Sequence, residues 1–220
     1  MEGFILFYIT VCIACYVIGS FPTAFVILKK RHGKNIIEEG SGNVGAMNSF
    51  DVTGSKLTGI AVFLLDFLKG LIPVGILIFV LNFEFPFIIL PAVLLVIGHN
   101  YSIFLRFKGG RGLATAAGVS VLINFWLVVI WGIGFLITYL IKKNVHWANV
   151  AATILAPIAA LFFPGILMDT TYGYFPGQSD GYYTAIKELL FVFSSSISLI
   201  ILLRHINPIV ELLKKPKSNE

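Results

Sequence analysis

"GLATAAGVSVLINFWLVVIWGIGFLITYLI" (residues 112–141) is the stretch that decides the fold of this chain. It contains no charged residue, and basic residues flank it, with Arg111 before it and Lys142 and Lys143 after it. It is longer than one membrane helix of about 20 residues requires, and shorter than two such helices. One interpretation is a short helix over 112–123, a break at Asn124 and a longer helix over 125–141. The other is a single long, tilted span.

The composition excludes a soluble protein. Of the 220 residues, 57% are hydrophobic and 12% are charged, and the mean hydropathy is +0.91, whereas soluble domains carry about a quarter charged residues. The first apolar run follows Glu2 rather than a basic start and has no small-x-small cleavage site, so we expect a retained helix. The further apolar runs predict one polytopic membrane domain over 1–220, with segments at about 4–28, 57–81, 86–104, 148–168 and 185–203 beside the two in the quoted stretch.

Basic residues gather in four clusters between these runs. The clusters are Lys29, Lys30, Arg31 and Lys34; Arg106, Lys108 and Arg111; Lys142 and Lys143; and Arg204, Lys214, Lys215 and Lys217. The connections near 82–86 and 169–184 hold acidic residues and no Lys or Arg. Because short loops rich in Lys and Arg stay in the cytoplasm, all four clusters should share that side, and 112–141 must enter the membrane and return. The prediction is an all-α integral membrane protein with about seven transmembrane segments, one of them short and partly re-entrant, with the N-terminus outside and the C-terminus cytoplasmic. The single-span alternative gives six helices and puts Lys142 and Lys143 outside.

The segment "GSGNVGAMN" (40–48) follows the first apolar run. Glycines at 40, 42 and 45 allow positive φ and close approach of the backbone to a ligand, and successive N–H groups then bind anions. Ser41, Asn43 and Asn48 add side-chain donors. The alternative is an ordinary loop in which Asn48 or Ser49 caps the next helix.

The segment "KGGRG" (108–112) precedes the short helix. Lys108 and Arg111 flank Gly109 and Gly110, and Gly112 leads into a helix whose first N–H groups face the same place, which together predict a phosphate site. The alternative is a basic anchor at the membrane surface. Two anion-binding loops on one face indicate two phosphorylated ligands, or a donor and an acceptor.

Four further polar residues occur at or within the helices. His99 and His205 end helices at the same face, and a lone histidine there is more often a packing residue than a catalyst; neither belongs to an HxxxxD pair. Asp66 and Lys69 lie three residues apart inside a span, where the favoured interpretation is a structural ion pair that faces the bundle interior.

These segments resemble the motifs of a known family, the bacterial acyl-phosphate-dependent glycerol-3-phosphate acyltransferases (PlsY type), over nearly the whole chain. "GSFPTAFVI" (19–27) and "LLDFLKG" (64–70) are similar to its first two helices, and "GSGNVGAMN" (40–48) resembles GSGNxGATN. "GHNYSIFLRFKGGRGLATA" (98–116) resembles GHxxPxxxxFKGGKGVATA, and "RHINPI" (204–209) resembles RHxxNI.

The resemblance implies an enzyme of the bacterial cell membrane that acts at its cytoplasmic face. It would transfer a fatty acyl group from acyl-phosphate to the 1-hydroxyl of glycerol 3-phosphate, giving lysophosphatidic acid. It implies a functional link to the enzyme that makes acyl-phosphate, and no cofactor, metal or nucleic acid. The implied catalytic residues are Ser41, Asn43, Lys108 and His205. The implied substrate- and phosphate-binding residues are Gly40, Gly42, Gly45, Asn48, His99, Gly109, Gly110, Arg111, Gly112 and Thr115.

The chain departs from the family motifs at four positions. Met47 replaces a Thr, Asp51 stands where an Arg is usual, Arg111 replaces a Lys, and Pro208 takes the Asn position of the last motif. The alternatives are therefore a divergent relative with another acceptor or reduced activity, and a transporter or binding protein for small phosphorylated anions.

Overall fold

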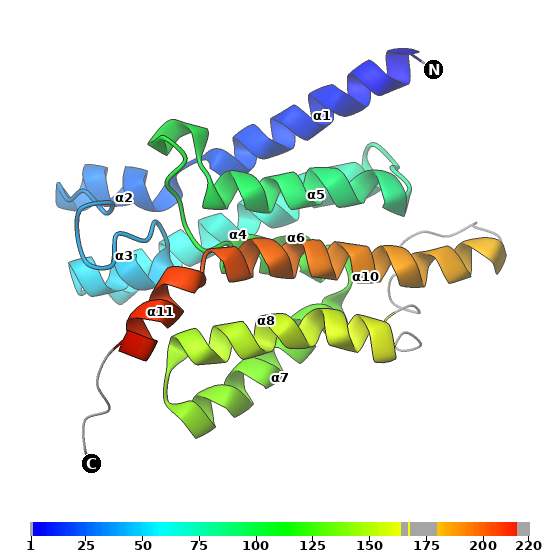
Figure 1. The fold of residues 1–220 in the computed structure, drawn as a ribbon. Helices are drawn as coiled ribbons and strands as arrows, with labels where there is room; N and C mark the ends of the chain where they lie inside the picture. The colour runs from blue at the N-terminus through cyan, green and yellow to red at the C-terminus, as the bar shows by residue number, and fades with distance from the viewer. Residues whose placement is uncertain (1, 164–166, 168–179, 215–220) are drawn as a thin grey trace.

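All regular secondary structure in the part of the chain that the structure describes is helical. The computed structural model describes residues 2–163, 167 and 180–214, with the side chains of 180–185 left aside. The elements are α1 (Glu2–Ser20), α2 (Thr23–His32), α3 (Ala46–Thr53), α4 (Lys56–Phe79), α5 (Phe85–Asn100), a 3₁₀ turn η1 (Ile103–Leu105), α6 (Leu113–Ile123), α7 (Phe125–Lys142), α8 (Val145–Phe162), α10 (Asp180–Leu203) and α11 (Ile206–Lys214) (Figure 1). Six helical stretches in this part are long and apolar enough to cross a membrane, and α6 is a shorter apolar helix. The predicted all-α membrane fold is confirmed.

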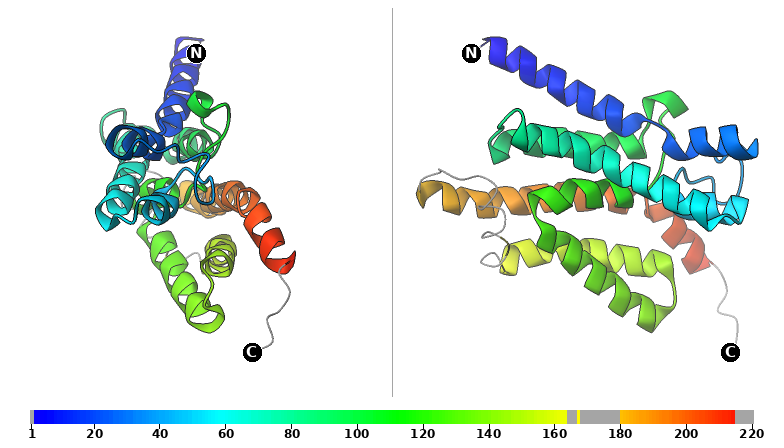
Figure 2. Two further views of the ribbon diagram at one scale, coloured as in Figure 1. Left: turned by 90° about the vertical axis from the view of Figure 1, so that its left-hand side faces the viewer. Right: turned by 180° about the vertical axis from the view of Figure 1, so that it is seen from behind.

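The stretch over 112–141 forms two helices and not one. Asn124 ends α6 and begins α7 with an extended backbone, and its side-chain oxygen accepts the N–H of Leu127 at 3.3 Å. The 11 residues of α6 are about 16 Å long, roughly half of a hydrocarbon core of about 30 Å. In Figures 1 and 2, α6 runs into the bundle and α7 returns towards the end from which α6 came. The interpretation as a single long span is therefore wrong.

The described members of the basic clusters gather at one end of the bundle. The loops around α2 and α3, the turn between α7 and α8, and α11 all lie at this end, whereas α1 starts at the opposite end (Figure 1). This arrangement agrees with a shared side for the four clusters. Which compartment that side faces stays a prediction.

The first predicted segment, 4–28, is wrong as a single helix. The chain leaves helical geometry at Phe21 and Pro22 between α1 and α2, because a proline lacks a backbone N–H and disfavours helical backbone at the residue before it. The carbonyl oxygen of Phe21 accepts a hydrogen bond from the ammonium of Lys69 at 3.1 Å. The break thus receives a polar partner from α4.

The other predicted boundaries differ by a few residues. α4 and α5 begin and end within about four residues of the predicted 57–81 and 86–104, as is usual for helix ends. The segment predicted over 148–168 is helical to Phe162, and residues 164–166 and 168 lie outside the described residues. α10 begins at Asp180, ahead of the predicted residue 185.

Two helix pairs approach so closely that only glycine fits between them. A Cβ on Gly98 of α5 would lie 2.3 Å from the carbonyl oxygen of Tyr16 in α1. A Cβ on Gly118 of α6 would lie 2.0 Å from the carbonyl oxygen of Phe67 in α4, and one on Gly70 would lie 2.3 Å from that of Thr115. Such contacts let backbones pack directly, as is common between membrane helices. The contacts of Gly70 and Gly118 fix α6, and with it the loop before α6, against α4.

Candidate active site

The two glycine-rich loops meet at the basic end of the bundle. We call residues 40–45 the GSGN loop and residues 108–112 the KGGRG loop. The N–H of Val44 in the first donates to the carbonyl of Gly109 in the second at 3.4 Å. A Cβ on Gly110 would lie 2.8 Å from the carbonyl oxygen of Val44. The structure therefore brings together two segments that lie more than sixty residues apart in sequence.

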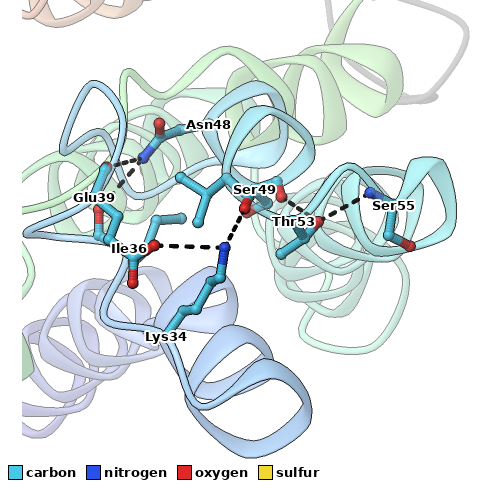
Figure 3. A network of polar contacts seen from close by, with 8 residues as sticks. Lys34, Ile36, Glu39, Asn48, Ser49, Thr53 and Ser55 are labelled. Carbon is cyan, nitrogen blue, oxygen red and sulfur yellow. Dashed lines mark hydrogen bonds and ion pairs between the residues drawn. The ribbon is translucent and has the colours of Figure 1, made fainter.

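Asn48 holds the GSGN loop in shape. Its side-chain oxygen accepts the N–H of Ser41 at 2.9 Å, and its amide donates to the carbonyls of Glu39 at 3.1 Å and Ile36 at 3.3 Å. Figure 3 shows the bonds that the amide of Asn48 donates, beside the bonds of Lys34, Ser49 and Thr53. The polar atoms of the buried Asn48 side chain therefore form hydrogen bonds with the loop backbone. It does not cap α3, whose N-cap is Gly45 without a side-chain bond.

The glycines of the GSGN loop serve different purposes. Gly40 and Gly42 have φ of 60° and 67°, the left-handed region in which glycine is favoured. A Cβ on Gly40 would also lie 2.2 Å from the side-chain oxygen of Asn48. Gly45 instead has an extended backbone with φ of −159°. The expectation of positive φ holds for Gly40 and Gly42 and is wrong for Gly45. The backbone conformation of Gly45 is one that any residue can adopt.

The KGGRG loop lies directly on the end of α5. The N–H of Gly110 donates to the carbonyl of His99 at 3.1 Å, and a Cβ on Gly110 would lie 2.0 Å from Nε2 of His99. Gly112 has φ of 83° and is the N-cap of α6. His99 itself is buried and lies 3.7 Å from Asp66, which pairs with Lys69 at 2.8 Å. The predicted ion pair between Asp66 and Lys69 is confirmed.

Arg204 joins the last motif to the KGGRG loop. Its Nε donates to the carbonyl of Gly110 at 3.0 Å and its terminal nitrogen to the carbonyl of Gly109 at 2.8 Å. Its guanidinium also lies over the ring of Tyr101, 5.4 Å from the centroid. Sequence reasoning placed Arg204 in a basic cluster and in the last motif, but not among the site residues. Its place in "RHINPI", one residue before a predicted site histidine, was the signal that it contributes to the site.

A cavity of about 770 Å³ opens beside the two loops and extends between α6, α7, α8 and α10. The part of its lining beside the two loops is polar and includes Asn43, Asp66, His99, Arg111 and His146. Its interior carries apolar and aromatic side chains, among them Leu127, Trp131, Phe135, Phe193 and Ile197. The cavity therefore has a polar end at the basic face and an apolar end among the membrane helices.

Arg111 is the cation of the KGGRG loop that faces this cavity. It is half-buried, lines the cavity, and one of its terminal nitrogens lies 3.3 Å from Nδ1 of His146 in α8. Burial and then the charge of Arg204 lower the pKa of Arg111, and Glu211 opposes the change, but a guanidinium remains protonated at neutral pH. His146 was not predicted as a site residue, because nothing in the sequence near a lone histidine at a helix start indicates a distant arginine.

His205 lies behind the cavity and not in its lining. It is 1% exposed, its Nδ1 bonds the carbonyl of Ile201 at 2.8 Å, and its buried Nε2 has no hydrogen-bond partner in the described part of the chain. Its ring lies 6.5 Å from that of His146. Burial, and less strongly the nearby charge of Arg111, lower its pKa to about 4 although the bond to Ile201 opposes this. His205 is therefore neutral at pH 7.

The remaining predicted residues lie in three settings. Asn43, Gly45 and Gly112 line the cavity with His99 and Arg111. Ser41 and Lys108 are exposed, and neither lines the cavity. Thr115 is fully buried where α6 packs on α4, and its hydroxyl has no partner among the described residues.

Two of the departures from the family motifs lie at the cavity. Met47 and Asp51, both exposed on α3, line it together with Arg111. Pro208 lies elsewhere, in the first turn of α11, where a backbone N–H has no partner within the helix in any case. The proline therefore costs α11 no hydrogen bond. Among the described residues, no group of three His, Cys, Asp or Glu side chains is placed to hold a metal ion.

Comparison with known proteins identifies the family of this chain. A family model described as glycerol-3-phosphate acyltransferase matches residues 9–215. The chain is 31% identical over 206 residues to the glycerol-3-phosphate acyltransferase of Endomicrobium trichonymphae, covering 94% of this chain and 92% of that protein. It is 35% identical over 203 residues to that of Lactococcus lactis subsp. lactis, covering 90% and 85%.

Solved structures support the same family assignment. The crystal structure of PlsY, an integral membrane glycerol 3-phosphate acyltransferase, in its glycerol 3-phosphate form superposes with a TM-score of 0.75 at 32% identity, covering 94% of this chain and 92% of that one. Its lysophosphatidic acid form gives 0.73 at the same identity, covering 94% and 91%. This chain belongs to the glycerol-3-phosphate acyltransferase family of integral membrane enzymes.

Proposed function

We propose that the protein transfers a fatty acyl group from acyl-phosphate to the 1-hydroxyl of glycerol 3-phosphate, releasing lysophosphatidic acid and inorganic phosphate. The observation that carries this proposal is the cavity of about 770 Å³, whose lining is polar beside the two glycine-rich loops and carries aromatic side chains between the membrane helices. Two phosphorylated substrates, one of which carries a long apolar tail, match both ends of such a cavity.

The phosphate of one substrate binds at the start of α6. The first hydrogen bond within α6 runs from the N–H of Ala116 to the carbonyl of Gly112, so the N–H groups of Leu113 and Ala114 have no partner within the helix. Both residues line the cavity beside Arg111. A helix N-terminus and a guanidinium together stabilise a phosphate dianion.

The second phosphate binds against the GSGN loop. Asn43 and Gly45 line the same cavity as Arg111. The backbone N–H groups of residues 41–45 already donate to other protein atoms, so the expected row of free N–H groups is not formed. The side-chain amide of Asn43 supplies the donors for this phosphate instead. The acyl chain lies in the apolar part of the cavity, against Trp131, Phe135 and Phe193. Ser41 and Lys108, which the family resemblance also implicates, contact the substrates as these approach the cavity.

The reaction requires positioning more than side-chain nucleophiles. The 1-hydroxyl oxygen of glycerol 3-phosphate attacks the carbonyl carbon of the acyl-phosphate, a new C–O ester bond forms, and the bond from that carbon to the phosphate oxygen breaks. The phosphate leaves with its electron pair, and the hydroxyl proton passes to a phosphate oxygen. Because acyl-phosphate is a mixed anhydride with a good leaving group, holding both substrates in line and stabilising the charge near the carbonyl supply the catalysis.

The proposed site faces the cytoplasm of a bacterial cell. Support comes from the described members of the four basic clusters, which lie at the same end of the bundle, since short basic loops stay on the cytoplasmic side. Both soluble glycerol 3-phosphate and acyl-phosphate at the membrane surface would then reach the cavity from the same side. The proposal links the protein functionally to an enzyme that makes acyl-phosphate.

The test uses the purified protein with radiolabelled glycerol 3-phosphate and palmitoyl-phosphate, with palmitoyl-coenzyme A and palmitoyl-acyl carrier protein as alternative donors. We expect labelled lysophosphatidic acid with palmitoyl-phosphate alone. Product with another donor and none with palmitoyl-phosphate would refute the proposed donor. No product with any donor, while an authentic family enzyme works in the same assay, would refute the activity.

Asp51 favours one alternative, a divergent enzyme with another acceptor or reduced activity. A carboxylate at the cavity lining repels a phosphate dianion, where an arginine would attract it. Replacing the phosphorylated acceptor by free glycerol in the same assay separates the two. Faster transfer to glycerol than to glycerol 3-phosphate would favour the alternative.

A further inference from the structure

The helix after the last span, α11, has two sharply different faces. Ile206, Val210 and Leu213 are spaced by four and three residues, so they share one face of the helix, and they are 52%, 39% and 68% exposed. Asn207, Glu211 and Lys214 follow at the same spacing one position later and form a polar face. An exposed apolar face next to an exposed polar face is typical of a helix that lies in a membrane surface.

The position of α11 matches that assignment. It begins three residues after the end of α10, at the basic end of the bundle, and projects away from the other helices (Figures 1 and 2). The remaining face of α11 is half-buried and carries Pro208, Ile209 and Leu212. α11 also contacts α8. The apolar face is thus left open at the depth where the spans end.

We propose that α11 is an interfacial helix whose apolar face (Ile206, Val210 and Leu213) inserts into the headgroup region of the membrane that the bundle spans. The occupant of this face is lipid of the same bilayer. Its polar face is turned to water, and Lys214, followed in the sequence by Lys215 and Lys217, contacts anionic headgroups, which attract basic residues next to a span.

The position of α11 matters to the site because α11 is continuous with it. The carbonyl of His205 accepts the N–H of Ile209 at 3.1 Å, within the first turn of α11. Arg204, one residue earlier, holds the carbonyls of Gly109 and Gly110. Lipid binding by α11 therefore fixes the depth at which Arg204 contacts the KGGRG loop relative to the membrane surface.

The test measures the depth of single spin labels in nanodiscs of phosphatidylcholine with phosphatidylglycerol. The background carries Cys12→Ala and Cys15→Ala, since both native cysteines are free and buried in α1. Val210→Cys and Leu213→Cys place labels on the apolar face, and Asn207→Cys and Glu211→Cys are the matched controls on the polar face. All four side chains are exposed, so each label has room, and an unchanged melting temperature checks the fold.

We expect collisions with dissolved oxygen to exceed collisions with a water-soluble nickel chelate several-fold at 210 and 213, and the reverse at 207 and 211. Exposure to the nickel chelate at all four positions would overturn the proposal, because the apolar face would then lie in water. Protection of 210 and 213 from both reagents would also overturn it, since a protein surface would then cover that face.

Discussion

Replacement of Arg204 tests whether the last motif acts through the KGGRG loop. Arg204 donates to the carbonyls of Gly109 and Gly110 at 2.8 and 3.0 Å. In a trans peptide the carbonyl and the following N–H point in opposite directions, so binding the Gly110 carbonyl on one side turns the N–H of Arg111 to the other. Arg204→Ala removes this constraint and leaves both loop carbonyls without their cation.

The size of the effect follows from the two bonds. A hydrogen bond to a charged group contributes about 1.5–3 kcal/mol, and Arg204 is half-buried, so solvent screening reduces the sum of the two bonds. We expect Arg204→Ala to cost about 2–3 kcal/mol of transition-state stabilisation, which is roughly a 30- to 160-fold loss of kcat/KM. Arg204→Lys should recover only part, because an ammonium lacks the planar pair of donors that reaches both carbonyls.

The assay is the initial rate of lysophosphatidic acid formation over a range of palmitoyl-phosphate concentrations. Arg31→Ala, which removes an exposed cation from the end of α2 at the same face, controls for the loss of one positive charge. Equal rates for Arg204→Ala and Arg31→Ala would refute the assignment. A fall in melting temperature with unchanged kcat/KM per folded protein would show that Arg204 serves only stability.

Three further predictions concern single residues. Gly110→Ala places a Cβ 2.0 Å from Nε2 of His99 and 2.8 Å from the carbonyl oxygen of Val44, so we expect a loss of about 1–3 kcal/mol in the free energy of unfolding and no detectable acyl transfer. Gly75→Ala, whose Cβ meets only Leu122 at 3.5 Å, is the matched control, and equal melting temperatures for the two variants would contradict the geometry. Asp51→Arg should lower the KM for glycerol 3-phosphate, because a cation replaces a carboxylate at the cavity lining; an unchanged or higher KM measured at saturating palmitoyl-phosphate would contradict that reasoning. His205 has a pKa of about 4 in the folded protein, below its ordinary 6.5, so the unfolded chain binds the proton first and stability is lost as the pH falls from 6.5 towards 4, by up to about 3 kcal/mol. His205→Gln should lack this component in melting curves recorded at both pH values, and an equal acid-induced loss in the variant and the wild type would contradict the pKa assignment.

The features predicted correctly from sequence are those with local causes. Asn124 interrupts an apolar stretch that is too long for one helix and too short for two, and the helix break occurs there. Asp66 and Lys69 are one helical turn apart, so their ion pair needs no tertiary knowledge. The Phe21–Pro22 break also had a local signal, since a proline lies within the first apolar run, and the hydropathy of that run obscured it.

The features that sequence reasoning missed depend on contacts between distant segments. Lys108 and Arg111 look equivalent in "KGGRG", yet Lys108 is exposed and Arg111 lines the cavity. Just before the loop, Arg106 and Phe107 take left-handed backbone conformations, which no sequence pattern indicates. Whether the side chain of Asn48 faces a substrate or the loop backbone depends in the same way on where Glu39 and Ile36 lie.

The short length of α6 explains how the cavity and the proposed phosphate site arise together. Thr115 and Gly118 form the face of α6 that packs against α4, while Ala114, Ala117 and Ser120, three residues apart, form a face of small side chains that lines the cavity. Because α6 ends at Asn124 and α7 returns at an angle, space stays open between α6 and the pair of α7 and α8. If α6 spanned the whole membrane, its N-terminus would still lie at the two loops. The chain would then emerge at the opposite side of the membrane, and α7 would not return to the basic end. The break at Asn124 therefore provides both the open cavity and the second wall that carries Trp131 and Phe135.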